Sequence, residues 1–157
     1  MSPPARYLED FVPGMVFEFG DRLVTAEEIV TFAREYDPQP FHLDDDAGKQ
    51  THFGGLVASG WQTAGFMMRM LVDHMLSPET SLGSPGLDQL RWLKPVRPGD
   101  RLRARVSIRE VKRSRSRPDM GTIHQTTEVL NQKDEVVMST ISIGMVRARA
   151  SAENSPG

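Results

Sequence analysis

Two residues suited to acid–base chemistry lie five positions apart in a stretch with two prolines. Asp37 and His42 are separated by Pro38-Gln-Pro40-Phe. Because each proline ring fixes its backbone φ angle, we expect the backbone to set the separation of the two side chains. A carboxylate and an imidazole that face one water can activate it and exchange its protons, and the ordinary histidine pKa of about 6.5 suits this role. The alternative is that Asp37 only ends a helix and His42 is an ordinary loop histidine.

A further chemical group is predicted where a long apolar segment begins. No charged residue occurs from Phe53 to Met68, but glycine and polar residues interrupt this stretch, which favours a buried helix over a membrane span. Ser59 and Gln62 fit a capping box in which the Ser59 hydroxyl accepts the Gln62 amide. The amide of Gly60 is then left free at a helix N-terminus, where negative charge is favoured. Glycine also lets a ligand approach without a Cβ in its path, so Gly60 is a candidate oxyanion donor.

The helix that starts after Ser59 is predicted to be apolar over most of its circumference. Pro78 disfavours helix at the preceding residue, which leaves a helix of about sixteen residues. Gln62, Arg69 and Asp73 fall on one narrow polar stripe, and apolar side chains cover the rest. A helix of this kind must be covered by other elements.

The remaining pattern predicts one α+β domain. A strand over 15–24 precedes a helix that opens with the capping box Thr25-Ala-Glu-Glu28 and ends at Asp37. Asp44 or Asp45 caps a short helix that runs through residue 50. Residues 101–109 alternate between apolar and polar side chains, as in a strand with one buried face. Further strands are predicted over 87–93, 121–130 and 135–147. One apolar helix followed by four long strands indicates a curved antiparallel sheet folded round that helix.

Composition excludes several classes of protein. A chain of 157 residues is most simply a single domain, with an ordered core over about 8–147 and frayed ends at 1–6 and 150–157. A net charge of -2 argues against a dedicated nucleic-acid or membrane binder. The chain has no cysteine, which excludes disulfides and thiol catalysis. The N-terminus has no apolar stretch typical of a signal peptide, so we expect a cytoplasmic protein.

The sequence indicates neither a metal site nor a tightly bound cofactor. Asp44, Asp45 and Asp46 lie near His42, but no glutamate closes a calcium-binding loop, and helix capping explains the aspartates better. No Walker, dinucleotide-binding, GxSxG or HExxH pattern occurs.

The stretch Asp37-Pro-Gln-Pro-Phe-His42-Leu-Asp44, followed by Gly55-Leu-Val-Ala-Ser59-Gly60, resembles the MaoC-like dehydratase family of the hot-dog fold. That family includes (R)-specific enoyl-CoA hydratases. The likeness runs from Val12 to about Arg147 and includes Lys94-Pro-Val-Arg-Pro-Gly-Asp100. Two positions depart from the family pattern, because Gln39 replaces the usual asparagine and Ser59 stands where many members have histidine.

The resemblance implies an enzyme that adds water to, or removes it from, the 2,3 double bond of an enoyl thioester of coenzyme A or acyl-carrier protein. Asp37 and His42 would be catalytic, Gly60 would bind the thioester oxygen, and Gln39, Ser59 and Trp61 would contact the substrate. It also implies a homodimer or an assembly of dimers. The basic loop over 109–117 is either a solvated hairpin tip or a site for coenzyme A phosphates.

Two other functions are compatible with the same fold. One is a thioesterase that directs water at the carbonyl carbon. The other is a non-catalytic subunit that binds acyl thioesters or serves as a structural partner. The spacing of Asp37 and His42 resembles hydration chemistry and argues against the thioesterase, whereas the presence of both residues together with Gly60 argues against the non-catalytic subunit.

Overall fold

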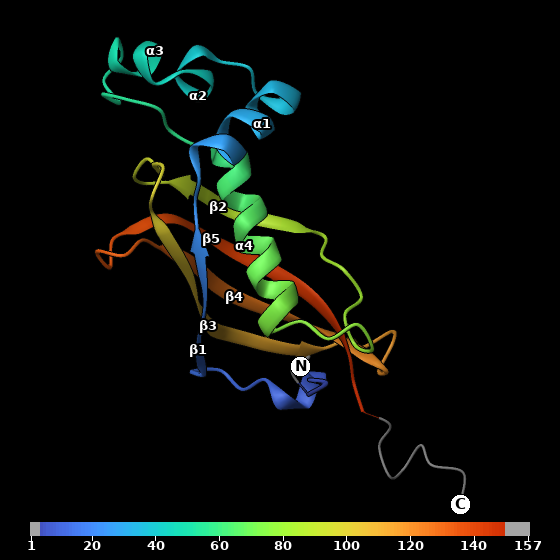
Figure 1. Ribbon diagram of the computed structural model, residues 1–157. Helices are drawn as coiled ribbons and strands as arrows, with labels where there is room; N and C mark the ends of the chain where they lie inside the picture. The colour runs from blue at the N-terminus through green and yellow to red at the C-terminus, as the bar shows by residue number, and fades with distance from the viewer. Residues whose placement is uncertain (1–3, 150–157) are drawn as a thin grey trace, which may run out of the picture.

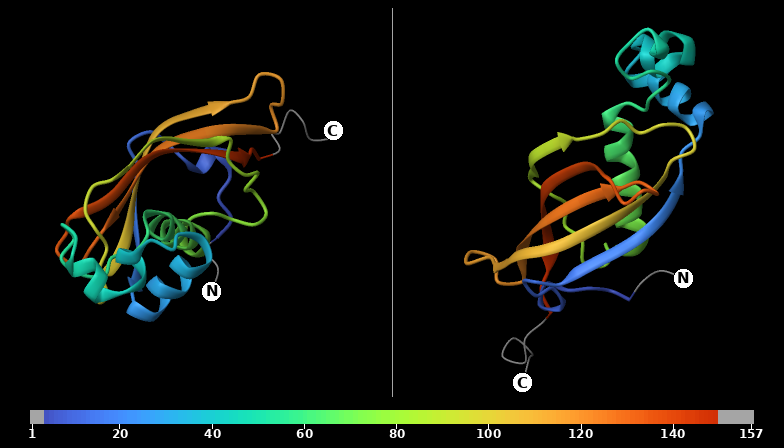
Figure 2. Two further views of the ribbon diagram at one scale, coloured as in Figure 1. Left: turned by 90° about the horizontal axis from the view of Figure 1, so that it is seen from above. Right: turned by 90° about the vertical axis from the view of Figure 1, so that its left-hand side faces the viewer.

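A curved antiparallel sheet surrounds one long helix (Figures 1 and 2). The computed structural model describes residues 4–149. The strands are β1 (Val16–Leu23), β2 (Gly86–Trp92), β3 (Arg101–Arg113), β4 (Met120–Leu130) and β5 (Val136–Arg147). The helices are the 3₁₀ turn η1 (Leu8–Asp10), α1 (Ala26–Tyr36), α2 (Pro40–Leu43), α3 (Asp45–Lys49) and α4 (Gly60–His74). The predicted α+β class is therefore confirmed.

The strands lie in the order β1-β3-β4-β5-β2, so β1 and β2 form the two edges. β3, β4 and β5 follow one another as hairpins, and the β4–β5 turn is held by the Asn131 side chain, whose oxygen accepts the Glu135 N–H at 3.1 Å. The alternation predicted for β3 is confirmed, because its inward side chains are at most 3 % exposed: Leu102, Ala104, Val106 and Ile108. The inner face of β4 and β5 is partly polar, and there the hydroxyls of Thr127 and Ser142 bond to each other at 3.1 Å.

Helix α4 lies in the concave face of the sheet, as the view from above shows (Figure 2). It buries Phe66 and Met70, which belong to the main core. Gly20 in β1 has a φ of +95°, and a Cβ there would meet the Met70 side chain, so glycine allows helix and strand to approach closely.

The predicted orientation of α4 is wrong in one respect. Trp61, Met68 and Val72 are 61 %, 45 % and 50 % exposed, whereas Gln62, expected on the polar stripe, is only 5 % exposed. The sheet of one chain covers only one side of the helix, and an apolar stripe is left on the other side. Gln62 is buried because its amide donates to the Glu28 carbonyl at 3.0 Å.

Helices α1, α2 and α3 lie beyond the end of the sheet at which α4 begins (Figure 1). The predicted capping box of α1 is confirmed, with Glu28 N–H to Thr25 Oγ1 at 3.2 Å and Thr25 N–H to Glu28 Oε1 at 2.9 Å. Asp44 caps α3 as predicted. Helix α2 replaces an expected loop, because Pro40 fits the first position of a helix, where no N–H is needed. We refer to residues 26–59 as the overhanging segment.

The opposite end of the domain contains the first described residues of the chain. Arg6, which the prediction of frayed ends included, donates its backbone N–H to Ser77 Oγ at 3.0 Å, and its carbonyl accepts the Thr80 hydroxyl at 2.6 Å. Residues 1–3 and 150–157, which the same prediction included, lie outside the described residues. None of the helices within this range combines the length and hydropathy required to cross a bilayer.

Candidate active site

Asp37 and His42 face each other where the overhanging segment meets α4. Asp37 is the C-cap of α1, and His42 lies in α2, so the turn between the two helices brings the side chains together. His42 Nε2 lies 3.3 Å from Asp37 Oδ2, and the two side chains are 8 % and 19 % exposed. His42 Nδ1 lies 2.6 Å from the Val57 carbonyl. Because a carbonyl can only accept, Nδ1 carries a proton, and Nε2 is directed at the carboxylate.

Two further side chains donate to the Asp37 carboxylate. The Gln39 amide donates to Oδ1 at 2.7 Å, and the Ser59 hydroxyl donates to Oδ2 at 2.8 Å. Burial acts to raise the pKa of Asp37, but these two hydrogen bonds and the charge of a protonated His42 outweigh it and lower the pKa below its ordinary value. Asp37 is therefore ionised at neutral pH and can accept a proton.

The predicted capping box at the start of α4 is wrong. The Ser59 hydroxyl accepts the Trp61 N–H at 3.3 Å, whereas the Gln62 N–H bonds to the Ser59 carbonyl at 3.0 Å. The reciprocal contact cannot form, because the Gln62 side chain reaches α1 instead. Within residues 4–149, the Gly60 N–H has no hydrogen-bond acceptor, so the helix still begins with an available donor.

We had expected open space beside Gly60, but a tryptophan side chain occupies it. An ideal Cβ on Gly60 would lie 2.7 Å from Trp92 Nε1 and closer still to two carbons of the indole. Trp92 also packs edge to face against Trp61, with ring centroids 5.1 Å apart. Glycine is therefore required at position 60 by the tryptophan at the end of β2, and this indole forms a wall next to the N-terminus of α4.

These residues line a cavity of about 590 Å³. All six residues singled out from the sequence lie on its wall: Asp37, Gln39, His42, Ser59, Gly60 and Trp61. Phe41 and Phe53, with ring centroids 5.2 Å apart, form an aromatic wall on the overhanging segment. Trp61 and Trp92 form a second aromatic pair in the lining.

The sequence did not assign Phe53, Trp92 or Arg97 to the site. Arg97 lies within the Lys94–Asp100 segment, and Trp92 lies two residues before it. The family likeness of this segment was the only signal in the sequence that pointed to this region. The basic loop proposed as an alternative phosphate site lies at the far end of the β3–β4 hairpin, away from this cavity (Figure 1).

Comparison with known families decides the assignment. A family model described as the MaoC like domain matches residues 10–130. The chain belongs to the MaoC-like family.

Solved and curated relatives agree with this membership. The crystal structure of a MaoC-like dehydratase from Rhodospirillum rubrum is 39 % identical and superimposes with a TM-score of 0.86 over 92 % of this chain and 99 % of that chain. A 3-hydroxybutyryl-CoA dehydratase of Methylorubrum extorquens is 31 % identical over 121 residues, 74 % of each protein. An uncharacterized protein, YdeM of Bacillus subtilis, is 27 % identical over 81 % of this chain and 89 % of its own length. Two other curated relatives are longer, and the MaoC-like chain covers 35 % and 24 % of them. The MaoC-like resemblance and the hot-dog fold expected from it are thus confirmed.

Proposed function

We propose that this MaoC-like protein adds water to, or removes it from, the 2,3 double bond of an enoyl thioester of coenzyme A, with an (R)-3-hydroxyacyl thioester as the hydrated partner. The observation that carries the proposal is the Asp37–His42 contact at 3.3 Å, on the wall of a cavity that also contains the N-terminus of α4. Membership in a family with relatives named dehydratases supports the reaction class.

In the hydration direction, the ionised Asp37 accepts a proton from a water that contacts both its carboxylate and His42. The water oxygen bonds to C3, and the electron pair of the double bond moves toward the thioester, where negative charge gathers on the carbonyl oxygen. The Gly60 N–H, at the positive end of α4, stabilises that charge. His42, protonated at Nε2, delivers a proton to C2 and is reprotonated by the proton that Asp37 took up. The sum of these steps is addition of one water.

The other side chains serve this chemistry by position. Gln39 and Ser59 hold the carboxylate in place and keep it ionised, and the Val57 carbonyl orients the His42 ring by accepting from Nδ1–H. The indoles of Trp61 and Trp92 give the thioester an apolar surface beside the oxyanion donor.

A panel of 2-enoyl-CoA substrates tests the function. Hydration is followed by loss of the enoyl absorbance, with a thiol reagent in a parallel reaction to detect free coenzyme A. We expect the absorbance to fall without thiol release. Thiol release at a comparable rate would indicate a thioesterase, and binding without either change would indicate a non-catalytic subunit.

We also propose that two chains form a homodimer. Strand β2 is an edge whose backbone is unpaired on one side, and Leu87 and Leu93 near it are exposed. The exposed apolar stripe of α4, Trp61, Met68 and Val72, adds a further uncovered surface. Pairing of β2 with its copy would cover the edge and place two such helices on the same side. Light scattering that gives a stable monomer at micromolar concentration would refute the dimer.

A further inference from the structure

Arg97 is a half-buried cation on the wall of the cavity, and it has no partner of opposite charge among the described residues 4–149. Four nearby basic side chains on the same loop and at the start of β3 are paired with carboxylates: Lys94 with Glu135, Arg101 with Asp21, Arg103 with Asp134 and Arg105 with Glu128. Across residues 4–149, no carboxylate lies within 4.0 Å of the Arg97 guanidinium. A charge that is partly removed from water and left unpaired costs stability, so its retention beside a cavity points to an anionic ligand.

The guanidinium is held in place by the overhanging segment. Its Nη2 donates to the Phe53 carbonyl at 2.5 Å, and the Arg97 backbone N–H donates to Asp100 Oδ2 at 2.9 Å. Guanidinium has five N–H donors, and the Phe53 carbonyl uses one of them. The remaining donors are in a fixed orientation, which reduces the entropy lost when they bind a planar or tetrahedral anion.

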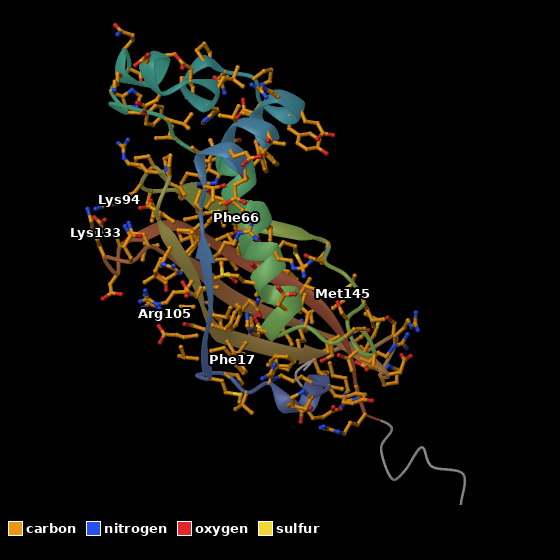
Figure 3. The ribbon with its side chains drawn as sticks, in the orientation of Figure 1. Phe17, Phe66, Lys94, Arg105, Lys133 and Met145 are labelled. Atoms are coloured by element: carbon orange, nitrogen blue, oxygen red, sulfur yellow. The ribbon has the colours of Figure 1, made fainter. Side chains whose placement is uncertain are left out.

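The position of Arg97 shows which part of a substrate it meets. Beside Asp37 the cavity lining includes the buried residues His42, Val57 and Ser59. On the Arg97 loop the lining residues Lys94 and Pro95 are exposed, and Lys94 lies at the end of the sheet nearest the short helices (Figure 3). With C2 and C3 of the acyl group beside Asp37 and the thioester beside Gly60, the part of the substrate at the rim is the carrier.

We propose that Arg97 binds a phosphate group of the carrier, and so makes the enzyme selective for coenzyme A thioesters over carriers without phosphate. This inference rests on the proposed function, because it requires the reacting carbons to lie beside Asp37. Lys94 stands at the same rim, but its contact with Glu135 leaves Arg97 as the cation available for the anion.

The experiment compares but-2-enoyl thioesters of coenzyme A, 4′-phosphopantetheine and pantetheine in wild type and Arg97→Gln. We expect kcat/KM for the coenzyme A thioester to fall about 10- to 100-fold in the variant, chiefly through KM, as loss of a charge-assisted hydrogen bond predicts. The pantetheine thioester has no phosphate, and its kcat/KM should change less than about twofold. Arg34→Gln, an exposed arginine of α1 outside the cavity, removes the same charge and should leave all three rates unchanged.

The 4′-phosphopantetheine thioester separates the sources of the phosphate. If it shows the full Arg97 effect, the bound group is the one that coenzyme A shares with acyl-carrier protein. If only the coenzyme A thioester shows it, the bound group is one of the nucleotide phosphates. Equal losses on all three thioesters would show that Arg97 acts only through its bond to Phe53, and would overturn the proposal.

Calorimetric binding of free coenzyme A gives a readout that does not depend on turnover. Weaker binding to Arg97→Gln than to wild type and Arg34→Gln would support the phosphate site even if no enoyl thioester were hydrated, in which case only the proposed function fails. Equal binding to all three proteins would remove the phosphate site and leave the hydratase proposal standing.

Discussion

Removal of Asp37 and His42, singly and together, tests whether the two side chains share one step. Asp37→Asn removes the base and keeps the shape of the side chain, and its amide oxygen still accepts from Ser59. For His42 the informative variant is His42→Asn, because the asparagine amide occupies the place of Nδ1 and can still donate to the Val57 carbonyl. Without that donor, a buried carbonyl would lose its partner, which costs about 1–3 kcal/mol of stability.

The size of the effect follows from the role assigned to each group. A proton-transfer residue contributes about 10²–10⁴-fold, so each single variant should lose that much in kcat, or about 2.7–5.5 kcal/mol of barrier. Two independent losses would multiply to about 10⁴–10⁸-fold. Because Nε2 and Oδ2 are 3.3 Å apart and the proposed mechanism has both act on one water, we expect the double variant to be little worse than the worse single one.

The assay is initial-rate hydration of but-2-enoyl-CoA, with thermal unfolding as the control for folding. KM should change much less than kcat, since neither residue is assigned to binding of the carrier. Multiplicative losses in the double variant would show that the two residues act in separate steps. Full activity in either folded single variant would place the chemistry elsewhere and favour a thioesterase or a binding subunit.

Three further variants test the surroundings of the pair. Ser59→Ala removes a hydrogen bond that lowers the pKa of Asp37, so the acid limb of the kcat/KM–pH profile should move to higher pH; an unmoved limb would mean that another group titrates there. Gln39→Asn should keep substantial activity, and Gln39→Ala should lose less than Asp37→Asn; an inactive but folded Gln39→Asn would contradict the positioning role. Gly60→Val should abolish turnover and, by overpacking against Trp92, lower the free energy of unfolding by about 1–3 kcal/mol. Addition of Trp92→Ala should restore most of that stability but not the activity, and recovery of activity would show that the valine side chain does not block the thioester oxygen.

Much of the fold was predictable because its signals are local. The limits of α4 follow from Ser59 and Pro78, and the observed strands begin and end within a few residues of the predicted ones. The largest difference is in β3, which was predicted to end at residue 109 and continues to Arg113. A register shift between Ile108 and Glu110 breaks the period-two pattern there. Helix α2 was missed because four residues are too few to show helical periodicity.

The candidate site was predictable only where its residues are close in sequence. Asp37 and His42 are joined by a short turn, so their proximity could be inferred from spacing. The packing of Trp92 on Gly60 depends on how β2 meets α4, and the contact of Arg97 with Phe53 depends on how the β2–β3 loop meets the overhanging segment. The Ser59 capping box failed for a related reason, since tertiary partners on α1 competed for Gln62 and Ser59. No local pattern reports such competition.

The edge-to-face pair of Trp61 and Trp92 has a practical optical consequence. These are the only two tryptophans in the chain, and both lie on the wall of the same cavity. Intrinsic emission excited at the red edge of indole absorption therefore comes from this site alone. A thioester that binds against the indoles would change both their solvent exposure and their mutual orientation. Binding could then be followed on the unmodified protein, with no label and no coupled reaction.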